Sequence, residues 1–130
     1  MPDTRLVLVV EDEPHIRDLV ALHLGLEGWT ADVVGDGLEA LERLRQNGYD
    51  LVILDIMLPD INGKEVCQRV RADDTLEQVK IICISGMVEQ DKVSDLRSAG
   101  ADDFMQKPFT VDKLVDRACE LLDMEKAILA

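Results

Sequence analysis

The sequence has few basic residues, few cysteines and no long apolar run. Only 14 of its 130 residues are Lys or Arg, against 27 Asp or Glu, so the formal net charge is −13. This balance argues against binding to nucleic acid or to anionic lipid, because both need a basic surface. It favours solubility, cationic partners or a metal ion.

The three cysteines, Cys67, Cys83 and Cys119, are scattered and odd in number, which indicates neither a disulfide framework nor a metal-ligand spacing. Cys83 lies in the apolar run VKIICIS and is expected to be a small buried side chain. His15 and His23 have no Cys or acid at chelating spacing. We interpret them as residues on the surface or edge of a helix.

No apolar run is long enough to span a membrane. The opening residues, MPDTRLVLVVEDE, lack the basic-then-apolar layout of a signal peptide. A hydrophobic content of 47% and a length of 130 residues suit one globular domain. We therefore expect a cytoplasmic protein with a single domain over residues 1–130 and a core at about residues 5–123.

Apolar runs of strand length alternate with segments of helical periodicity along the chain. Strands are expected at residues 5–10, 29–35, 49–55, 79–85 and 102–106. Helices are expected at residues 14–28, 36–48, 62–73, 88–100 and 110–127. The near-continuous apolar strands indicate burial on both faces, hence a parallel sheet between helices. The pattern predicts a three-layer α/β fold of the doubly wound kind.

The helices carry start signals and apolar faces. Pro14 suits a first turn, Asp36 with Glu39 forms a capping-box pattern, and Thr110 is a candidate N-cap. The side chains expected to face inward are Ile16, Leu19, Val20 and Leu24; Leu38, Leu41 and Leu44; Val66 and Val70; Val93 and Leu96; and Leu114, Ala118, Leu121 and Leu122.

Polar side chains follow four of the five expected strands. In an open parallel sheet, ligands bind at the carboxyl ends of the strands. The residues that this rule brings to one edge are Glu11, Asp12, Asp55, Ser85 and Lys107. Clustered carboxylates repel each other and need a cation, most naturally Mg²⁺ with its preference for oxygen ligands.

Asp55 is the most unusual of these residues, because it ends a strand whose other residues look fully buried. A carboxylate there is costly to desolvate unless it is paired or placed to react. A carboxylate, a magnesium ion, a lysine and a hydroxyl together suit phosphoryl transfer to an aspartate. Ser85 could then hydrogen-bond a phosphoryl oxygen.

Each residue alone has a plainer interpretation. Glu11 and Asp12 could be first-turn acids that complement a helix dipole, and for Glu13 we prefer that interpretation. Ser85 before glycine is a common turn, and Lys107 could be only a salt-bridge partner. The specificity lies in the combination at successive strand ends.

The motifs VVEDE, DLVILDIMLPDING, IICISG and GADDFMQKPF resemble the receiver domain of two-component response regulators over nearly the whole chain. The resemblance implies a flavodoxin-like sheet of five parallel strands in the order 2-1-3-4-5, flanked by five helices. It implies that Asp55 accepts phosphate from a phosphohistidine. It also implies that Glu11, Asp12, Asp55 and the backbone carbonyl of Met57 hold Mg²⁺, for which Mn²⁺ can substitute.

The resemblance also implies a switch. Ser85 would move toward the phosphoryl group, Lys107 would pair with that group, and the bond between Lys107 and Pro108 would be cis. Phe104 matches an aromatic position that turns inward with the hydroxyl, although an aromatic in a short edge strand is often simple packing. Because the added charge biases nearby loops, such a site can control a distant surface.

Two methionines bear on how long the phosphoryl group would last. Met57 and Met87 lie two residues beyond Asp55 and Ser85, at positions that influence the hydrolytic water in this family. Neither side chain can orient water, so we hypothesise slow autodephosphorylation. The chain is expected to promote only its own phosphorylation and dephosphorylation, and not to act as an enzyme on other substrates.

The expected partners are a sensor histidine kinase or phosphotransfer protein and a downstream protein or output domain, with a homodimer on phosphorylation as a further option. The output surface would comprise the fourth helix, fifth strand and fifth helix, with Lys92, Arg97, Lys113 and Arg117 among its acids. No direct contact with nucleic acid or membrane is expected. A stand-alone receiver and a piece of a longer regulator or hybrid kinase both fit the sequence.

Three other functions remain as alternatives. A magnesium-dependent aspartyl-phosphate phosphatase usually carries an acid two residues after its nucleophile, where this chain has Met57. A flavodoxin-like nucleotide binder would need a glycine-rich loop where this chain has EDEP. A receiver-like scaffold that acts without phosphorylation would not need the complete set of acid, hydroxyl and lysine.

Overall fold

The computed structural model describes the backbone of residues 5–86 and 90–129, and the side chains of residues 5–86 and 94–122. Five strands form one parallel sheet in the order β2-β1-β3-β4-β5. The strands are β1 (Leu6–Val10), β2 (Thr30–Val34), β3 (Leu51–Asp55), β4 (Lys80–Ser85) and β5 (Asp103–Gln106). The predicted fold class is confirmed.

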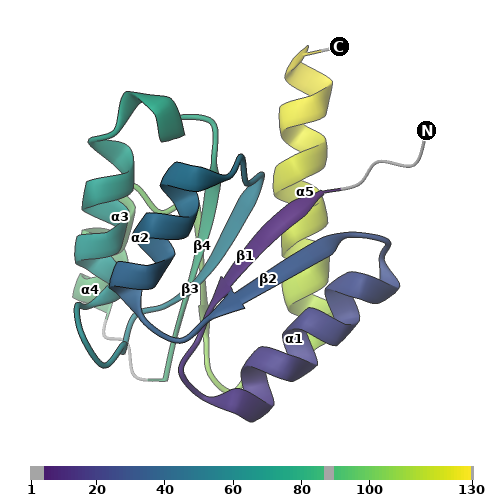
Figure 1. The fold of residues 1–130 in the computed structure, drawn as a ribbon, viewed down its shortest axis with the longest axis horizontal. Helices are drawn as coiled ribbons and strands as arrows, with labels where there is room; N and C mark the ends of the chain where they lie inside the picture. The colour runs from purple at the N-terminus through teal and green to yellow at the C-terminus, as the bar shows by residue number, and fades with distance from the viewer. Residues whose placement is uncertain (1–4, 87–89, 130) are drawn as a thin grey trace.

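Five α-helices cover the two faces of the sheet, with α1 and α5 on one side and α2, α3 and α4 on the other (Figure 1). They are α1 (Pro14–Leu26), α2 (Gly37–Gln46), α3 (Gly63–Arg71), α4 (Gln90–Ala99) and α5 (Val111–Leu129). A short 3₁₀ helix, η1 (Asp74–Leu76), between α3 and β4 was not predicted. None of the helices in the described ranges has the length and apolar character needed to cross a bilayer.

The core divides into two apolar clusters, one on each face of the sheet. The central strands β1, β3 and β4 supply side chains to both clusters, which explains their nearly unbroken apolar sequences. The cluster under α2, α3 and α4 includes Leu41, Val66 and Val70, and the cluster under α1 and α5 includes Leu24 and Leu114.

Two predicted core positions are wrong. Leu19 is 46% exposed and Leu38 is 52% exposed, so neither belongs to the buried face of its helix. Periodicity places both near an apolar stripe, but each lies at the stripe's edge, where the sheet no longer covers it. Val93 was also expected to face inward, but its side chain lies outside the described residues.

The predicted caps are present. The Asp36 carboxylate accepts a hydrogen bond of 2.8 Å from the Glu39 amide, and the Thr110 hydroxyl accepts one of 3.3 Å from the Lys113 amide. Glu13 caps α1 by accepting from the amide of His15, which confirms its interpretation as an acid that supports a helix start.

Candidate phosphoryl-acceptor site

The candidate residues meet at the carboxyl edge of the sheet, because parallel strands end there together. Glu11 directly follows β1, Asp55 is the last residue of β3, and Ser85 is the last residue of β4. Lys107 directly follows β5. Glu11, Asp55 and Ser85 are buried, with exposed fractions of 0%, 2% and 2%.

Lys107 joins the two buried carboxylates. Its Nζ lies 2.9 Å from Oε1 of Glu11 and 2.9 Å from Oδ2 of Asp55. One ammonium therefore partly compensates two carboxylates that are withdrawn from water. The plainer interpretation of Lys107, a salt-bridge partner, is compatible with this geometry and does not exclude a chemical role.

The pKa values of Glu11 and Lys107 are both raised above their usual values. Burial, followed by the contact with Asp55, raises the pKa of Glu11 to about 7, against the opposing effect of Lys107. Burial works to lower the pKa of Lys107, but hydrogen bonds and charge from Glu11 and Asp55 outweigh it and raise that pKa. The site is thus a cluster of acids with less positive charge than it can accommodate.

The residues present fit a hard divalent cation. One carboxylate oxygen from each of Glu11, Asp12 and Asp55 lies within 4.8 Å of the others. Asp12 is exposed, so the cluster opens to solvent on that side. Three carboxylates with solvent access match the oxygen ligands and retained waters that Mg²⁺ prefers.

The connection from β3 to α3 is held by contacts that the sequence did not reveal. Oδ1 of Asp55 accepts from the Met57 amide at 2.9 Å, and the Gly63 amide donates to the Ile56 carbonyl at 2.9 Å. A Cβ on Gly63 would lie 2.8 Å from Cα of Ile56, so only glycine fits this close approach. The carbonyl of Met57, a predicted metal ligand, lies within this fixed segment.

Asp60 ties the same connection to α2. Its two carboxylate oxygens accept from the amides of Gly37 and Leu38, both at 2.9 Å, at the start of α2. These bonds hold the pKa of Asp60 below its usual value against the effect of burial. Sequence reasoning missed Asp60, since its partners lie 22 and 23 positions earlier and no local pattern signals them.

The predicted switch residues lie on the β4–β5 side of the site. The carbonyl of Ser85 accepts from the Lys107 amide at 2.7 Å, and the peptide bond between Lys107 and Pro108 is cis. Phe104 pairs with Cys83 in register and packs, partly buried, against the cluster under α2, α3 and α4. Met57 is 72% exposed, and Met87 lies outside the described residues.

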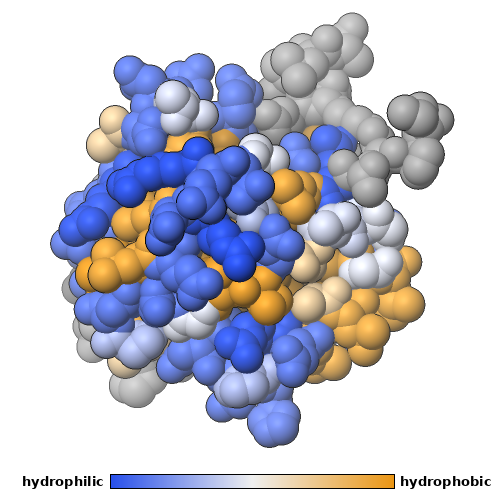
Figure 2. All heavy atoms as spheres, viewed as in Figure 1, coloured by the Kyte–Doolittle hydropathy of each residue, from blue (hydrophilic) through white to orange (hydrophobic). Residues whose placement is uncertain are grey.

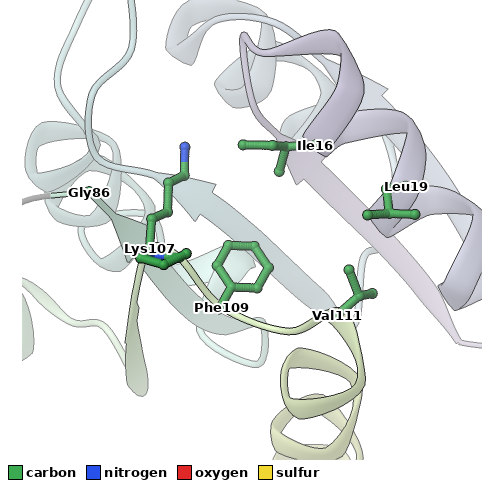
Figure 3. Close-up of a pocket in the computed structure, with 7 residues that line it drawn as sticks. Ile16, Leu19, Gly86, Lys107, Phe109 and Val111 are labelled. Atoms are coloured by element: carbon green, nitrogen blue, oxygen red, sulfur yellow. The ribbon is translucent and has the colours of Figure 1, made fainter.

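An apolar hollow of about 400 Å³ lies beside Lys107. Figure 3 shows Ile16 and Leu19 of α1 on one side of it and Phe109 and Val111 on the other. Leu19 lines this hollow and also belongs to the exposed face of α1, together with Leu22 and Leu26, which are 60% and 74% exposed. The same face appears as an apolar area in Figure 2. Sequence reasoning missed this surface because it assigned Leu19 to the core.

Comparison with known proteins places these features in a family context. Residues 7–119 match the family described as the response regulator receiver domain. The chain is 43% identical over 116 residues to the transcriptional regulatory protein TrcR of Mycobacterium tuberculosis, covering 89% of this chain and 44% of that protein. It is 39% identical over 116 residues to the response regulator ArlR of Staphylococcus saprophyticus, covering 89% and 51%.

Solved structures share the fold. A CheY-like response regulator receiver domain protein from Methanospirillum hungatei superposes with a TM-score of 0.90 at 25% identity, covering 96% of this chain and 98% of that chain. The chain spans about half the length of the curated relatives described above. The resemblance read from the motifs is confirmed by both kinds of comparison.

Proposed function

We propose a phosphorylation-dependent signalling function for this chain, which belongs to the family of response regulator receiver domains. In this proposal Asp55 accepts a phosphoryl group, and the modified site alters a surface that a partner or output domain reads. The observation that carries the proposal is the bridge from Lys107 to both Glu11 and Asp55, at 2.9 Å each. A buried acid held beside a cation at an open edge is suited to nucleophilic attack on phosphorus.

The reaction transfers the phosphoryl group from a phosphohistidine of a sensor kinase or phosphotransfer protein. An oxygen of Asp55 forms the new bond to phosphorus, the phosphorus–nitrogen bond breaks, and the electron pair of that bond stays on the histidine ring. Lys107 stabilises negative charge on the transferring oxygens, as an ammonium so close to the carboxylate can do.

Glu11, Asp12 and Asp55, together with the carbonyl of Met57, would hold a magnesium ion, for which Mn²⁺ can substitute. The bound ion supplies charge neutralisation for the phosphoryl oxygens. The buried Glu11 also keeps Lys107 oriented toward Asp55 through their contact of 2.9 Å. The bond from the Met57 amide to Asp55 keeps the carboxylate fixed before the donor arrives.

The phosphodonor would approach through the apolar hollow beside Lys107 (Figure 3). Ile16, Leu19 and Phe109 line that hollow, and the exposed leucines of α1 continue it. A helix that carries a phosphohistidine flanked by apolar side chains would fit such a surface. The net charge of −13 favours a donor with basic residues around that apolar strip.

The output step uses Ser85 and Phe104. The Ser85 hydroxyl moves toward the new phosphoryl group, and Phe104, the second residue of β5, fills the space that opens. The surface that changes comprises α4, β5 and α5, where Arg117 pairs with Asp103 at 2.6 Å. Among its other basic residues Arg97 and Lys113 are exposed, while the side chain of Lys92 lies outside the described residues.

Slow autodephosphorylation is part of the proposal. Met57 is 72% exposed beside Asp55 and offers no group that could orient a water for attack on phosphorus. A phosphoryl half-life of minutes or longer is therefore expected, and a half-life of seconds would contradict this part. Met87 has the same proposed role.

The test is intact mass after incubation with acetyl phosphate and Mg²⁺, with Asp55→Asn as the matched variant. One added phosphoryl group, absent in the variant and in excess chelator, is the expected result. If the folded chain binds Mg²⁺ but gains no phosphoryl group, a phosphate-independent scaffold becomes the better interpretation. Turnover of an added phosphomonoester would instead favour the phosphatase.

A further inference from the structure

Two cysteines meet in the core although they are distant in sequence. Sγ of Cys67 on α3 lies 3.6 Å from Sγ of Cys83 on β4, and both side chains are completely buried. Both belong to the cluster under α2, α3 and α4, whereas Cys119 belongs to the cluster on the opposite face of the sheet. The sheet therefore separates Cys119 from this pair. Neither Cys67 nor Cys83 has a role in the proposed phosphoryl transfer.

The arrangement of the two sulfur atoms suits a pair of thiols that can form a disulfide, and it does not suit a metal site. Structural zinc needs four ligands, and the described residues offer no third His, Cys, Asp or Glu group at this pair. A disulfide bond has a length of about 2.05 Å, so the two sulfur atoms must approach by roughly 1.5 Å. Side-chain rotation and a small shift of α3 toward β4 can supply that approach.

The two thiols differ in character. The hydrogen bond with Cys83 lowers the pKa of Cys67, while that bond and burial raise the pKa of Cys83. The direction of these shifts favours Cys67 as the first of the two thiols to lose its proton. Since a thiolate is the reactive form, we assign the first step to Cys67 and the second step to its neighbour Cys83, whose sulfur lies 3.6 Å away.

We propose that Cys67 and Cys83 form an oxidation site, at which a small peroxide such as hydrogen peroxide converts the pair to an intramolecular disulfide. The Cys67 thiolate attacks one peroxide oxygen, the oxygen–oxygen bond breaks, and water leaves as the other oxygen takes up a proton. Cys83 then attacks the sulfur of the resulting sulfenic acid and loses its proton, the sulfur–oxygen bond breaks, and a second water leaves. Two thiols are oxidised by two electrons and one peroxide is reduced to two waters.

A small oxidant fits this place in the fold. Because both thiols are fully buried, the reaction needs a local opening of α3 away from β4, and a small neutral molecule can use a brief opening. The pair is therefore expected to react slowly and stoichiometrically. Once formed, the disulfide would close a loop between residues that are 16 positions apart and raise the thermal midpoint by several degrees.

The disulfide would also act on the site described above, a step that rests on the proposed function. Cys83 lies two residues before Ser85 on β4, and α3 begins at the end of the segment that follows Asp55. A disulfide between α3 and β4 would restrain the helix that follows the Asp55 segment and the strand that ends at Ser85. We expect the oxidised chain to take up phosphate from acetyl phosphate several-fold more slowly than the reduced chain.

The experiment treats the folded chain with hydrogen peroxide and measures intact mass and a non-reducing peptide map. The supporting result is a loss of two hydrogen atoms, a cross-linked peptide pair containing Cys67 and Cys83, and full reversal by dithiothreitol. Cys119→Ser should behave like the wild type, and Cys67→Ala and Cys83→Ala should each abolish the loss. The map of the wild type decides the assignment even if a core variant fails to fold.

Three outcomes would overturn the inference. They are addition of oxygen atoms without loss of hydrogen, a disulfide that involves Cys119, or a disulfide that forms only when the chain is unfolded in urea. An unchanged phosphorylation rate in the oxidised chain would remove the regulatory step. Failure of the reduced chain to accept phosphate would count against the proposed function, and would leave the mass result for the disulfide unaffected.

Discussion

Nζ of Lys107 lies 2.9 Å from Oδ2 of Asp55, although the two residues are 52 positions apart. The register of the parallel sheet brings them together: Asp55 pairs with Ile84 on β4, and Ser85 pairs with Gln106 on β5. Lys107 therefore follows β5 one step beyond the level of Ser85. A charge pair at this place depends on the sheet order and not on any local contact.

Replacement of Lys107 by alanine should have opposite effects on two properties of the site. Two buried acids lose their compensating charge, so Mg²⁺ should bind more tightly, by roughly tenfold. Phosphorylation by acetyl phosphate should be slower by roughly 100-fold, because charge on the transferring oxygens is no longer stabilised. Calorimetry with Mg²⁺ and the rate of phosphorylation measured by mass would check both effects.

Lys113→Ala is the control for that variant, since Lys113 is an exposed lysine in the first turn of α5 and is not part of the bridge from Lys107 to Glu11 and Asp55. It should change neither property. If the Lys107→Ala protein has the circular dichroism of the wild type but loses Mg²⁺ binding and phosphorylation together, the assignment of opposing roles is contradicted.

Asp60 should influence the site through the segment that follows Asp55. Asp60→Ala removes the bonds to the amides of Gly37 and Leu38, which should lower the free energy of unfolding by about 1 kcal/mol. It should also slow phosphorylation several-fold, because the segment that carries the Met57 carbonyl is no longer tied to α2. Urea unfolding and the rate with acetyl phosphate are the measurements.

Asp36→Ala provides a matched control, because Asp36 caps the same helix through the Glu39 amide but does not belong to the β3–α3 segment. Both variants should lose similar stability, and only Asp60→Ala should lose phosphorylation rate. Equal phosphorylation rates for the two variants would show that Asp60 acts only as a cap of α2.

The ends of the strands were predictable because each one is a local event in the sequence. The strands β1, β3 and β4 end at Val10, Asp55 and Ser85, where each apolar run gives way to polar residues. The rule that parallel strands share one carboxyl edge places these polar residues together. The sequence alone therefore predicted the cluster of Glu11, Asp55 and Lys107. It could not predict that Glu11 is fully buried while its neighbour Asp12 is exposed, since that depends on how α1 leaves the sheet.

Contacts between distant side chains were not predictable. The bonds from α2 to Asp60 and the contact between Cys67 and Cys83 depend on how neighbouring helices and strands pack, and neither leaves a pattern in the sequence. Helical periodicity identified the apolar stripes of α1 and α2 but overestimated their width, which is why Leu19 and Leu38 were assigned to the core.

Gly63 should be intolerant of a side chain because it packs against the strand end that carries Asp55. A Cβ there would lie 2.8 Å from Cα of Ile56 and 2.9 Å from the carbonyl oxygen of Asp55, both backbone atoms. Gly63→Ala should lower the free energy of unfolding by about 1–3 kcal/mol and slow phosphorylation. Gly48→Ala, where nothing lies within 4 Å, is the control and should leave both unchanged. A stable, fully active Gly63→Ala protein would show that the β3–α3 segment adapts freely.

Tyr49 should make the stability of the chain fall at high pH. Its hydroxyl donates to Oδ2 of Asp32 at 2.6 Å, and burial, then the bond and charge of Asp32, raise the pKa of Tyr49 from 10.0 to about 12. The folded state therefore favours the neutral phenol. Its contribution to stability is fully present below the unfolded pKa of 10.0 and is lost as pH rises through about 12.

The loss should be at most about 1.4 kcal/mol of unfolding free energy for each pH unit between those values. Tyr49 is the only tyrosine in the chain, so tyrosinate absorbance near the ultraviolet edge reports its ionisation directly. Tyr49→Phe should start less stable at neutral pH, because it leaves Asp32 without the phenol, but should lose less stability on going to pH 12. Two results would contradict this account: a tyrosinate midpoint near pH 10 in the folded chain, or equal losses of unfolding free energy in the wild type and Tyr49→Phe. Either result would mean that Asp32 and burial do not hold the proton on the phenol.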